Sequence, residues 1–275
     1  MKLLTCVLTE NDCYKAKRTI IPKGVMVHST GANNPYLRRY VQPVPSTPGR
    51  EELLAALGTN PNANDWNRGG QWVNGKWVPL NACVHGFIGK LADGSVAAVQ
   101  ALPWNCRGWH AGRGASGKSA NDTHISFEIC EDGLTDPDYF KRVYREAVEL
   151  TAYLCRQYGL DPLADGVVIC HSEGYRRGIA SGHADVEHWF PRHGKSMDDF
   201  RADVAAELAS KPEQEKENDD MTYYKTLADV PVWYRDAVQK AVDKGVLYGS
   251  ENGGLDLSED LCRTLTVLDR LGKLD

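Results

Sequence analysis

Two short apolar runs, far apart in the chain, end in the same polar pair and predict two similar strands. Residues 24–29 (GVMVHS) and 166–172 (GVVICHS) each place β-branched and other apolar side chains after a glycine. Runs of this length and composition are typical of buried strands. The first run delivers His28 and the second delivers His171, each followed by a serine. The pattern therefore predicts two strands that each present a histidine where the strand ends.

Further strand-like runs lie between these two. Asn-Gly at 74–75, inside residues 71–78, and Asp-Gly at 93–94 are strong signals for β-hairpin turns. The strands expected around the second turn, and one later strand, are residues 84–90, 95–100 and 125–130. The last of these places Glu128 between apolar neighbours. A carboxylate in that setting is either paired, for example with an arginine, or has a raised pKa that chemistry can use.

Helical periodicity is clearest after residue 136. Asp136-Pro137 opens a helix with proline near its first turn, and Gly159 closes it. Between them, apolar residues recur at steps of three and four and form one core-facing stripe: Phe140, Val143, Ala147, Leu150 and Leu154. A second helix is expected from Ser196 to about Leu208.

The chain divides by composition into two folded parts. Residues 211–220 contain no apolar side chain and are predicted to be a charged, solvated linker. We therefore expect a domain over residues 1–210 and a small module over 221–275, which opens at Met221, a possible internal start. Two helices are predicted in this module, one with Trp233, Ala237 and Ala241 on a shared face and one through Arg263, Leu265, Leu268 and Leu271.

Bulk composition excludes several classes of function. The 275 residues carry a net charge of −5, which argues against a nucleic-acid partner. No apolar run is long enough for a membrane span, so membrane insertion is not expected. The first apolar stretch is short and Glu10 follows early, so no secretory signal is recognised and synthesis in the cytoplasm is expected. None of the eight cysteines forms a CxxC pair, and we expect them to be reduced.

Residues 168–190 are rich in side chains that can bind a metal or transfer a proton. This segment holds three of the eight histidines, two glutamates and an aspartate. The strands that deliver His28 and His171, with a nearby aspartate, supply three nitrogen or oxygen ligands. Three such ligands with a fourth position left open are the composition of a catalytic zinc site.

These motifs, taken together, resemble those of the zinc-dependent N-acetylmuramoyl-L-alanine amidases, the superfamily that includes peptidoglycan recognition proteins and phage lysozyme-type amidases. The resemblance covers roughly residues 20–205, in the order residues 25–30, 84–94, 109–112, 125–128 and 171–185. It implies an α/β fold with a mixed central β-sheet flanked by α-helices. The linker and the small, mainly helical C-terminal module resemble the wall-binding ends of phage or prophage endolysins.

The resemblance also implies a set of site residues. His28, His171 and Asp185 become the zinc ligands, with His183 in a cationic or hydrogen-bonding position two residues before Asp185. The alternative is that His183 is itself the third ligand. Glu128 would move the proton from the attacking water to the leaving amine. His183 would stabilise the oxyanion. The remaining residues, expected to line the substrate cleft, are His85, Trp109 and His110.

Three functions follow from this resemblance. The first is an endolysin that cuts the amide bond between N-acetylmuramic acid and L-alanine in Gram-positive peptidoglycan, made in the host cytoplasm and acting on the wall after release. The second is a cytosolic amidase that recycles soluble muropeptides, although such a substrate needs no appended module. The third is a protein that binds peptidoglycan without cleaving it. The C-terminal module would bind wall polymer, with self-association as a further possibility.

Overall fold

The computed structural model describes residues 1–68, 70–79, 82–210, 223–248, 254–255 and 257–274. The chain separates into two compact units, Met1–Ser210 and Lys211–Asp275, and each is considered by itself. The predicted linker at 211–220 and the possible start at Met221 lie outside the described residues.

A six-stranded mixed sheet forms the centre of the first unit. Its strands lie in the order β1-β6-β5-β7-β2-β8. They span Leu3–Thr5 (β1), Gly24–Asn33 (β2), Gly86–Lys90 (β5), Val96–Gln100 (β6), His124–Glu131 (β7) and Val168–Cys170 (β8). Only the pairing of β5 with β6 is antiparallel in this sheet, as expected for the hairpin that turns at Asp93-Gly94. The predicted mixed α/β architecture is confirmed.

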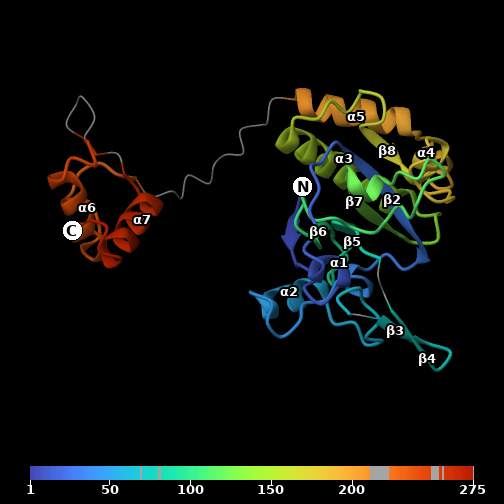
Figure 1. Ribbon diagram of the computed structural model, residues 1–275, viewed down its shortest axis with the longest axis horizontal. Coiled ribbons are helices and arrows are strands. Elements are labelled where there is room, and N and C mark those ends of the chain that lie inside the picture. The colour runs from blue at the N-terminus through green and yellow to red at the C-terminus, as the bar shows by residue number, and fades with distance from the viewer. Residues whose placement is uncertain (69, 80–81, 211–222, 249–253, 256, 275) are drawn as a thin grey trace. The chain divides into compact units, whose positions relative to one another are not determined.

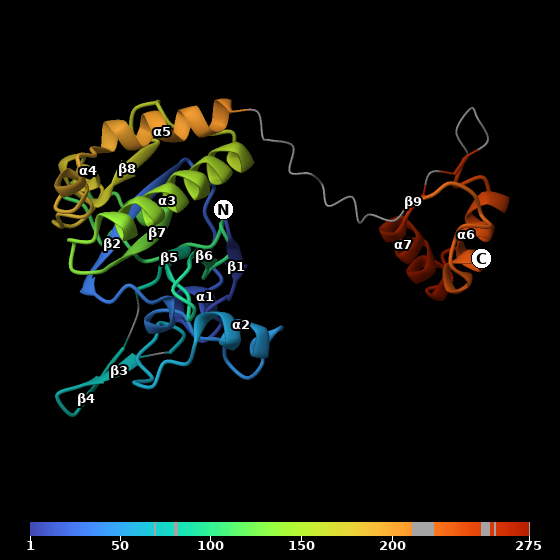
Figure 2. The same ribbon diagram turned by 180° about the vertical axis from the view of Figure 1, so that it is seen from behind.

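Helices cover both faces of this sheet (Figures 1 and 2). On one face lie α3 (Pro137–Tyr158) and α5 (Met197–Ala209), both close to their predicted bounds. Their buried apolar side chains form a single core with the strand residues Val25, Val27, Ile125 and Phe127. On the other face lie α1 (Asp12–Lys15) and α2 (Arg50–Leu57). A second apolar core there includes Leu8, Leu57 and Phe87.

The first residues of α3 show why this helix begins where it does. The Asp136 side chain accepts hydrogen bonds from the backbone N–H groups of Asp138 and Tyr139, which the helix itself leaves unpaired. At the other end Gly159 adopts φ +64°, a left-handed conformation that glycine reaches without strain. The apolar stripe between these ends packs on the sheet, as its spacing predicts.

The alternation along β2 and β7 decides where polar side chains project. Val25 and Val27 of β2, like Ile125 and Phe127 of β7, face α3. Because successive side chains of a strand point to opposite faces, His28 and Glu128 project from the face away from α3. The two are also paired in register on adjacent strands.

The hairpin that turns at Asn74-Gly75 and several short helices complete the first unit. Strands β3 (Gly70–Val73) and β4 (Lys76–Pro79) pair around Asn74-Gly75, as predicted, with positive φ at both turn residues. Short helices span Leu37–Arg39 (η1), Ala120–Asp122 (η2), His171–Arg176 (α4) and Phe190–His193 (η3). All eight cysteines are buried and free, in agreement with the expectation of reduced thiols.

The second unit contains two helices beside a two-stranded sheet. Strands β9 (Tyr223–Tyr224) and β10 (Leu257–Ser258) pair antiparallel, and the helices are α6 (Val232–Asp243) and α7 (Glu259–Arg270). Ala237, Ala241 and Leu265 are buried in its core, as predicted. Trp233 shares the helical spacing of Ala237 and Ala241, as predicted, but it is 67% exposed and is not part of this core. Leu271 is likewise 65% exposed.

Among the helices that the structure describes, none is both long and apolar enough to cross a membrane.

Candidate active site

Strand register brings the two sequence-predicted histidines side by side. His28 is the fifth of the ten residues of β2, whose neighbours are β7 and β8, so it lies within the strand and not, as predicted, where the strand ends. Val27 pairs with Cys170 of β8, so His171, the next residue, lies beside His28. His171 is the first residue of α4 rather than part of the strand. Both imidazoles are buried, with 1% and 4% of the residue exposed.

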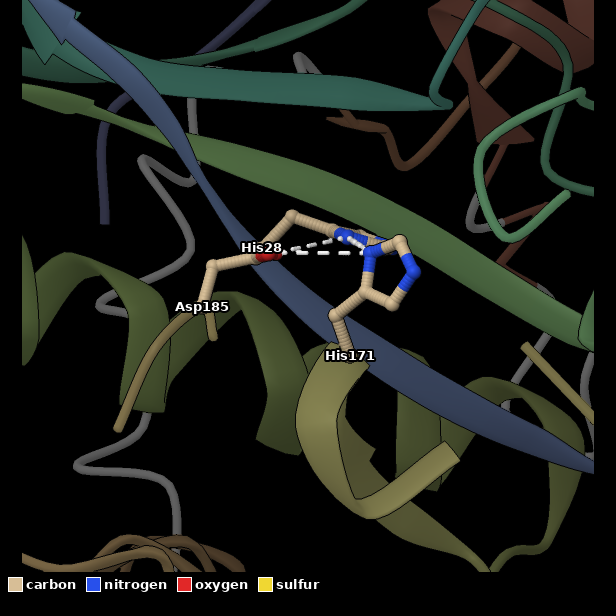
Figure 3. Close-up of side chains that lie close together, drawn as sticks. All are labelled: His28, His171 and Asp185. Atoms are coloured by element: carbon tan, nitrogen blue, oxygen red, sulfur yellow. Dashed lines mark hydrogen bonds and ion pairs between the residues drawn. The ribbon is translucent and has the colours of Figure 1, made fainter. Parts of the chain in front are cut away.

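Asp185 completes a cluster with these two histidines (Figure 3). Its carboxylate Oδ2 lies 3.0 Å from His28 Nδ1 and 3.6 Å from His171 Nδ1. The two Nδ1 atoms lie 3.0 Å apart. The loop that carries Asp185 is tied to α4, because the backbone N–H of Ser172 donates to the Asp185 carbonyl at 3.2 Å. Side chains from β2, α4 and this loop thus point at one another.

This donor set fits a metal ion. Ligand atoms on a tetrahedral zinc with bonds of about 2.0 Å lie about 3.3 Å apart, which matches the three separations. Burial lowers the pKa of His28, although Asp185 opposes that effect, so His28 is neutral and can offer a lone pair. Burial alone would raise the pKa of Asp185, but hydrogen bonds from His171 and His28 outweigh it and hold the pKa below its ordinary value. Two imidazoles and one carboxylate form a site that can hold zinc.

His28 and His171 each contact a further histidine through the ring nitrogen that faces away from the cluster. His28 Nε2, the nitrogen away from the cluster, lies 3.0 Å from His110 Nδ1. His171 Nε2 lies 3.1 Å from His183 Nδ1 and 3.4 Å from Ser181 Oγ. His183 therefore contacts the outer side of His171, whereas Asp185 contacts its inner side. Among the described residues, the only cluster of metal-ligand type is His28, His171 and Asp185.

Glu128 faces the same cavity as this cluster. The cavity has a volume of about 580 Å³, and its lining includes His28, His110, Glu128, His171, His183 and Asp185. One carboxylate oxygen of Glu128, Oε2, is buried and makes no hydrogen bond within the described part of the chain. Burial, then the nearby charges of Asp185 and Glu131, raise the pKa of Glu128 well above its ordinary value. Such a carboxyl group suits proton transfer.

The cavity also contains a hydrogen-bonded group that the sequence patterns did not indicate. Glu131 accepts from Ser29 Oγ at 2.6 Å and from His188 Nε2 at 2.9 Å. Both Glu131 and His188 line the cavity. The one available signal was the position of Glu131 at the end of the strand that carries Glu128.

Two residues expected in the cleft lie elsewhere. His85 is fully buried, where its Nδ1 accepts from the Ser126 backbone N–H and its Nε2 donates to the Cys106 carbonyl. These two hydrogen bonds hold His85 in the core, so its role is structural. Trp109 is 37% exposed and lines a separate cavity of about 380 Å³. His110, by contrast, lines the main cavity as expected.

Comparison with known proteins decides the family. A family model described as N-acetylmuramoyl-L-alanine amidase matches residues 17–192, well over half of the chain. The chain belongs to this family. The match runs from before β2 into η3, so this amidase family region contains all the cavity residues named above.

Solved structures similar to this chain include a hydrolase and an endolysin. The Staphylococcus aureus hydrolase AmiA, in complex with its ligand, is 18% identical with a TM-score of 0.49, over 76% of this chain and 83% of that one. A mutant endolysin from Bacillus subtilis is 19% identical with a TM-score of 0.43, over 74% and 99%. At these levels the similarity adds nothing to the family assignment.

A weaker similarity involves another class of protein. The S-adenosylmethionine decarboxylase proenzyme of Nicotiana tabacum is 28% identical over 127 residues, 44% of this chain and 35% of that one. The chain thus spans about a third of the length of the curated relatives it matches. A match to less than half of either chain does not define a family, and the amidase assignment stands on the family match.

Proposed function

We propose that the chain hydrolyses the amide bond between N-acetylmuramic acid and the L-alanine of the peptidoglycan stem peptide, with zinc as its metal. The observation that carries the proposal is one cavity lined by a His-His-Asp donor cluster and by an unpartnered, buried carboxylate oxygen of Glu128. Membership of the amidase family supports it. A protein that only binds peptidoglycan has no use for this combination.

We assign the zinc ligands to His28 Nδ1, His171 Nδ1 and Asp185 Oδ2. The mutual distances of 3.0 to 3.6 Å support this set. His183 is the weaker candidate for third ligand, because its Nδ1 contacts the outer nitrogen of His171. When bound, zinc supplies a Lewis acid that polarises the scissile carbonyl and lowers the pKa of the attacking water toward about 7.

Glu128 moves the proton in the proposed reaction. Its carboxylate takes a proton from the attacking water and gives it to the nitrogen of the leaving alanine. The free Oε2 and the raised pKa both support this role. A base with a pKa closer to neutrality can accept the proton and later release it.

His183 holds the carbonyl oxygen of the substrate in this proposal. If His171 binds zinc through Nδ1, its Nε2 carries a hydrogen and donates to His183 Nδ1. With Nδ1 as the acceptor, the Nε2–H of His183 is available to an oxyanion in the cavity. Of the two positions the sequence allowed, cationic or hydrogen-bonding, this geometry supports the second.

The products of digestion test the proposal. Purified peptidoglycan incubated with the zinc-loaded chain is expected to release stem peptides with a free N-terminal alanine, detected by mass spectrometry and amino-group labelling. Reducing sugar ends should not increase. New reducing ends without free alanine would identify a glycosidase instead and overturn the proposal. Comparing intact wall with soluble muropeptides separates the endolysin role from recycling, because only the endolysin should favour wall.

Replacing Glu131 with glutamine is expected to move the acid limb of the pH–rate profile to lower pH. Glu131 is one of the charges that raise the pKa of Glu128, so its removal lowers that pKa. Glu128 then remains deprotonated, and able to act as a base, at lower pH. The shift should be about one unit or less, because burial is the larger cause. Measured profiles of wild type, Glu131→Gln and the distant Glu207→Gln check this; an acid limb shifted to higher pH contradicts it.

We further propose that the second unit binds wall polymer and that the chain acts as an endolysin. Large apolar side chains are exposed on this unit, among them Val232, Trp233 and Leu271. A tether of this kind raises the local concentration of substrate around the amidase region. A second copy of the chain is the other partner that such side chains could contact.

Deleting residues 221–275 is expected to weaken sedimentation with purified walls by roughly tenfold or more, because the tether is lost. Zinc content should not change, since all three proposed ligands lie in the first unit. The comparison is best made in chains that also carry Glu128→Gln, so that the wall stays intact. Unchanged sedimentation rules out the wall-binding role, and a loss of dimers on deletion points to self-association.

A further inference from the structure

The hydrogen bond behind His28 limits how this histidine can bind a metal. A neutral imidazole has one N–H and one lone pair, and a histidine ligand must direct the lone pair at the metal. His28 directs Nδ1 into the cluster, within 3.0 Å of Asp185 and of His171 Nδ1. Its hydrogen must then be on Nε2, where His110 Nδ1 lies 3.0 Å away. His110 can accept this hydrogen only if its own hydrogen is on Nε2.

Nothing else in the described part of the chain dictates the tautomer of His110. Its Nε2 is buried and has no hydrogen-bond partner there. His85, its neighbour, uses both ring nitrogens on other groups. The tautomer of His110 is thus free to follow that of His28.

The backbone around His110 is held rigidly by one buried side chain. Asn121, on η2, is fully buried. Its Oδ1 accepts from the backbone N–H groups of His110 and Ala111, at 2.7 and 2.9 Å. Its Nδ2 donates to the Gly112 carbonyl at 3.0 Å. Three of the four hydrogen-bonding positions of this amide therefore hold the loop that presents His110.

We propose that His110 is a positioning residue for the metal site. Its Nδ1 accepts the Nε2–H of His28 and so stabilises the tautomer in which His28 Nδ1 binds zinc, while Asn121 holds the His110 loop in place. The inference rests on the zinc site of the proposed function. Partners of this kind, behind a metal ligand, typically change metal affinity by about 10- to 100-fold when removed.

His171 offers an internal comparison. Two groups stand behind its Nε2, His183 Nδ1 and Ser181 Oγ, and either can accept its hydrogen. The loss of His183 therefore leaves an acceptor in place. The loss of His110 leaves His28 with none, because His110 is the sole partner of His28 Nε2 among the described residues.

Two variants of similar shape separate hydrogen bonding from packing. His110→Asn keeps an acceptor oxygen close to the former Nδ1, whereas His110→Leu has nearly the same shape and no acceptor. The zinc dissociation constant of each full-length chain is measured by competition with a chromophoric chelator, with His183→Leu as the comparison. We expect His110→Leu to bind zinc about 10- to 100-fold more weakly than wild type. His110→Asn and His183→Leu should lie within a few-fold of wild type.

Equal zinc affinity of the Asn and Leu variants, whether both are weak or both are unchanged, overturns the inference. If His110→Leu does not fold, as judged by its melting curve without zinc, nitrogen-15 NMR of the zinc-loaded wild type decides. A hydrogen on His28 Nε2 and an unprotonated His110 Nδ1 support the inference, and a protonated His110 Nδ1 contradicts it. The two proposals can fail separately. If only the Leu variant binds zinc weakly and the wild type releases no alanine, His110 still positions the metal site but the proposed function is wrong.

Discussion

Replacing Asp185 with alanine is expected to strip zinc from the protein and to slow amide hydrolysis by about a thousandfold or more. Asp185 Oδ2 is the only oxygen in the donor cluster, 3.0 Å from His28 Nδ1. Without it two imidazoles remain, fewer than the three protein ligands usual in catalytic zinc sites. Metal assistance lowers the activation barrier by several kcal/mol, and about 4 kcal/mol corresponds to a thousandfold in rate. Zinc per chain and the rate of alanine release are measured on the same samples.

Two further variants make this result specific to the donor cluster. Asp165→Ala removes a carboxylate that pairs with Arg177 on the surface, and it should leave zinc and rate unchanged. His183→Ala should keep zinc and lose rate, because His183 lies behind His171 and outside the cluster. If His183→Ala loses the metal and Asp185→Ala keeps it, the two residues exchange roles and our ligand assignment is wrong.

Replacing Glu128 with glutamine is expected to keep zinc in place and to slow hydrolysis by about 10²- to 10⁴-fold, the usual contribution of a general acid–base. Glutamine has nearly the same size but cannot take the proton of the attacking water. Glu128 is also not a member of the donor cluster, so the metal should remain. Zinc analysis and rates of alanine release, again on the same sample, separate this outcome from metal loss.

Asp185→Ala and Glu128→Gln together distinguish a metal ligand from a group that moves the proton. One variant should lose metal and rate together, and the other should lose rate alone. A Glu128→Gln chain that hydrolyses within a few-fold of wild type would mean that another group moves the proton. The hydrogen-bonded pair of Glu131 and His188, which lines the same cavity, would then be the next group to test.

The positions of His28, Glu128 and His171 could be predicted because they depend on local patterns. Apolar runs of strand length fixed β2, β7 and β8, and alternation along them decided which side chains share a face. Asp185 is different, since it lies on an irregular loop. Its place beside His28 depends on tertiary contacts such as the hydrogen bond from Ser172, which no local pattern shows. The family resemblance, rather than periodicity, suggested it.

Other features depend on packing partners that the sequence does not reveal. Trp233 follows the helical spacing of Ala237 and Ala241, yet it is exposed, because α7 and the small sheet cover only part of α6. His85 sits in a motif that suggests a cleft residue, but it directly precedes the interior strand β5 and both of its ring nitrogens are hydrogen-bonded within the core. Helix α2 lies in a stretch rich in proline, glycine and asparagine, whose composition hides a helix of eight residues.

We propose that one zinc ion, held by His28, His171 and Asp185, is required for amide hydrolysis. The most direct measurement is the rate of alanine release from purified peptidoglycan by metal-free protein, as zinc is added back in known amounts. We expect no release without metal, a rate that rises in proportion to bound zinc, and a plateau at one zinc per chain. Full activity of the metal-free protein, or zinc binding with no release at any occupancy, would contradict it.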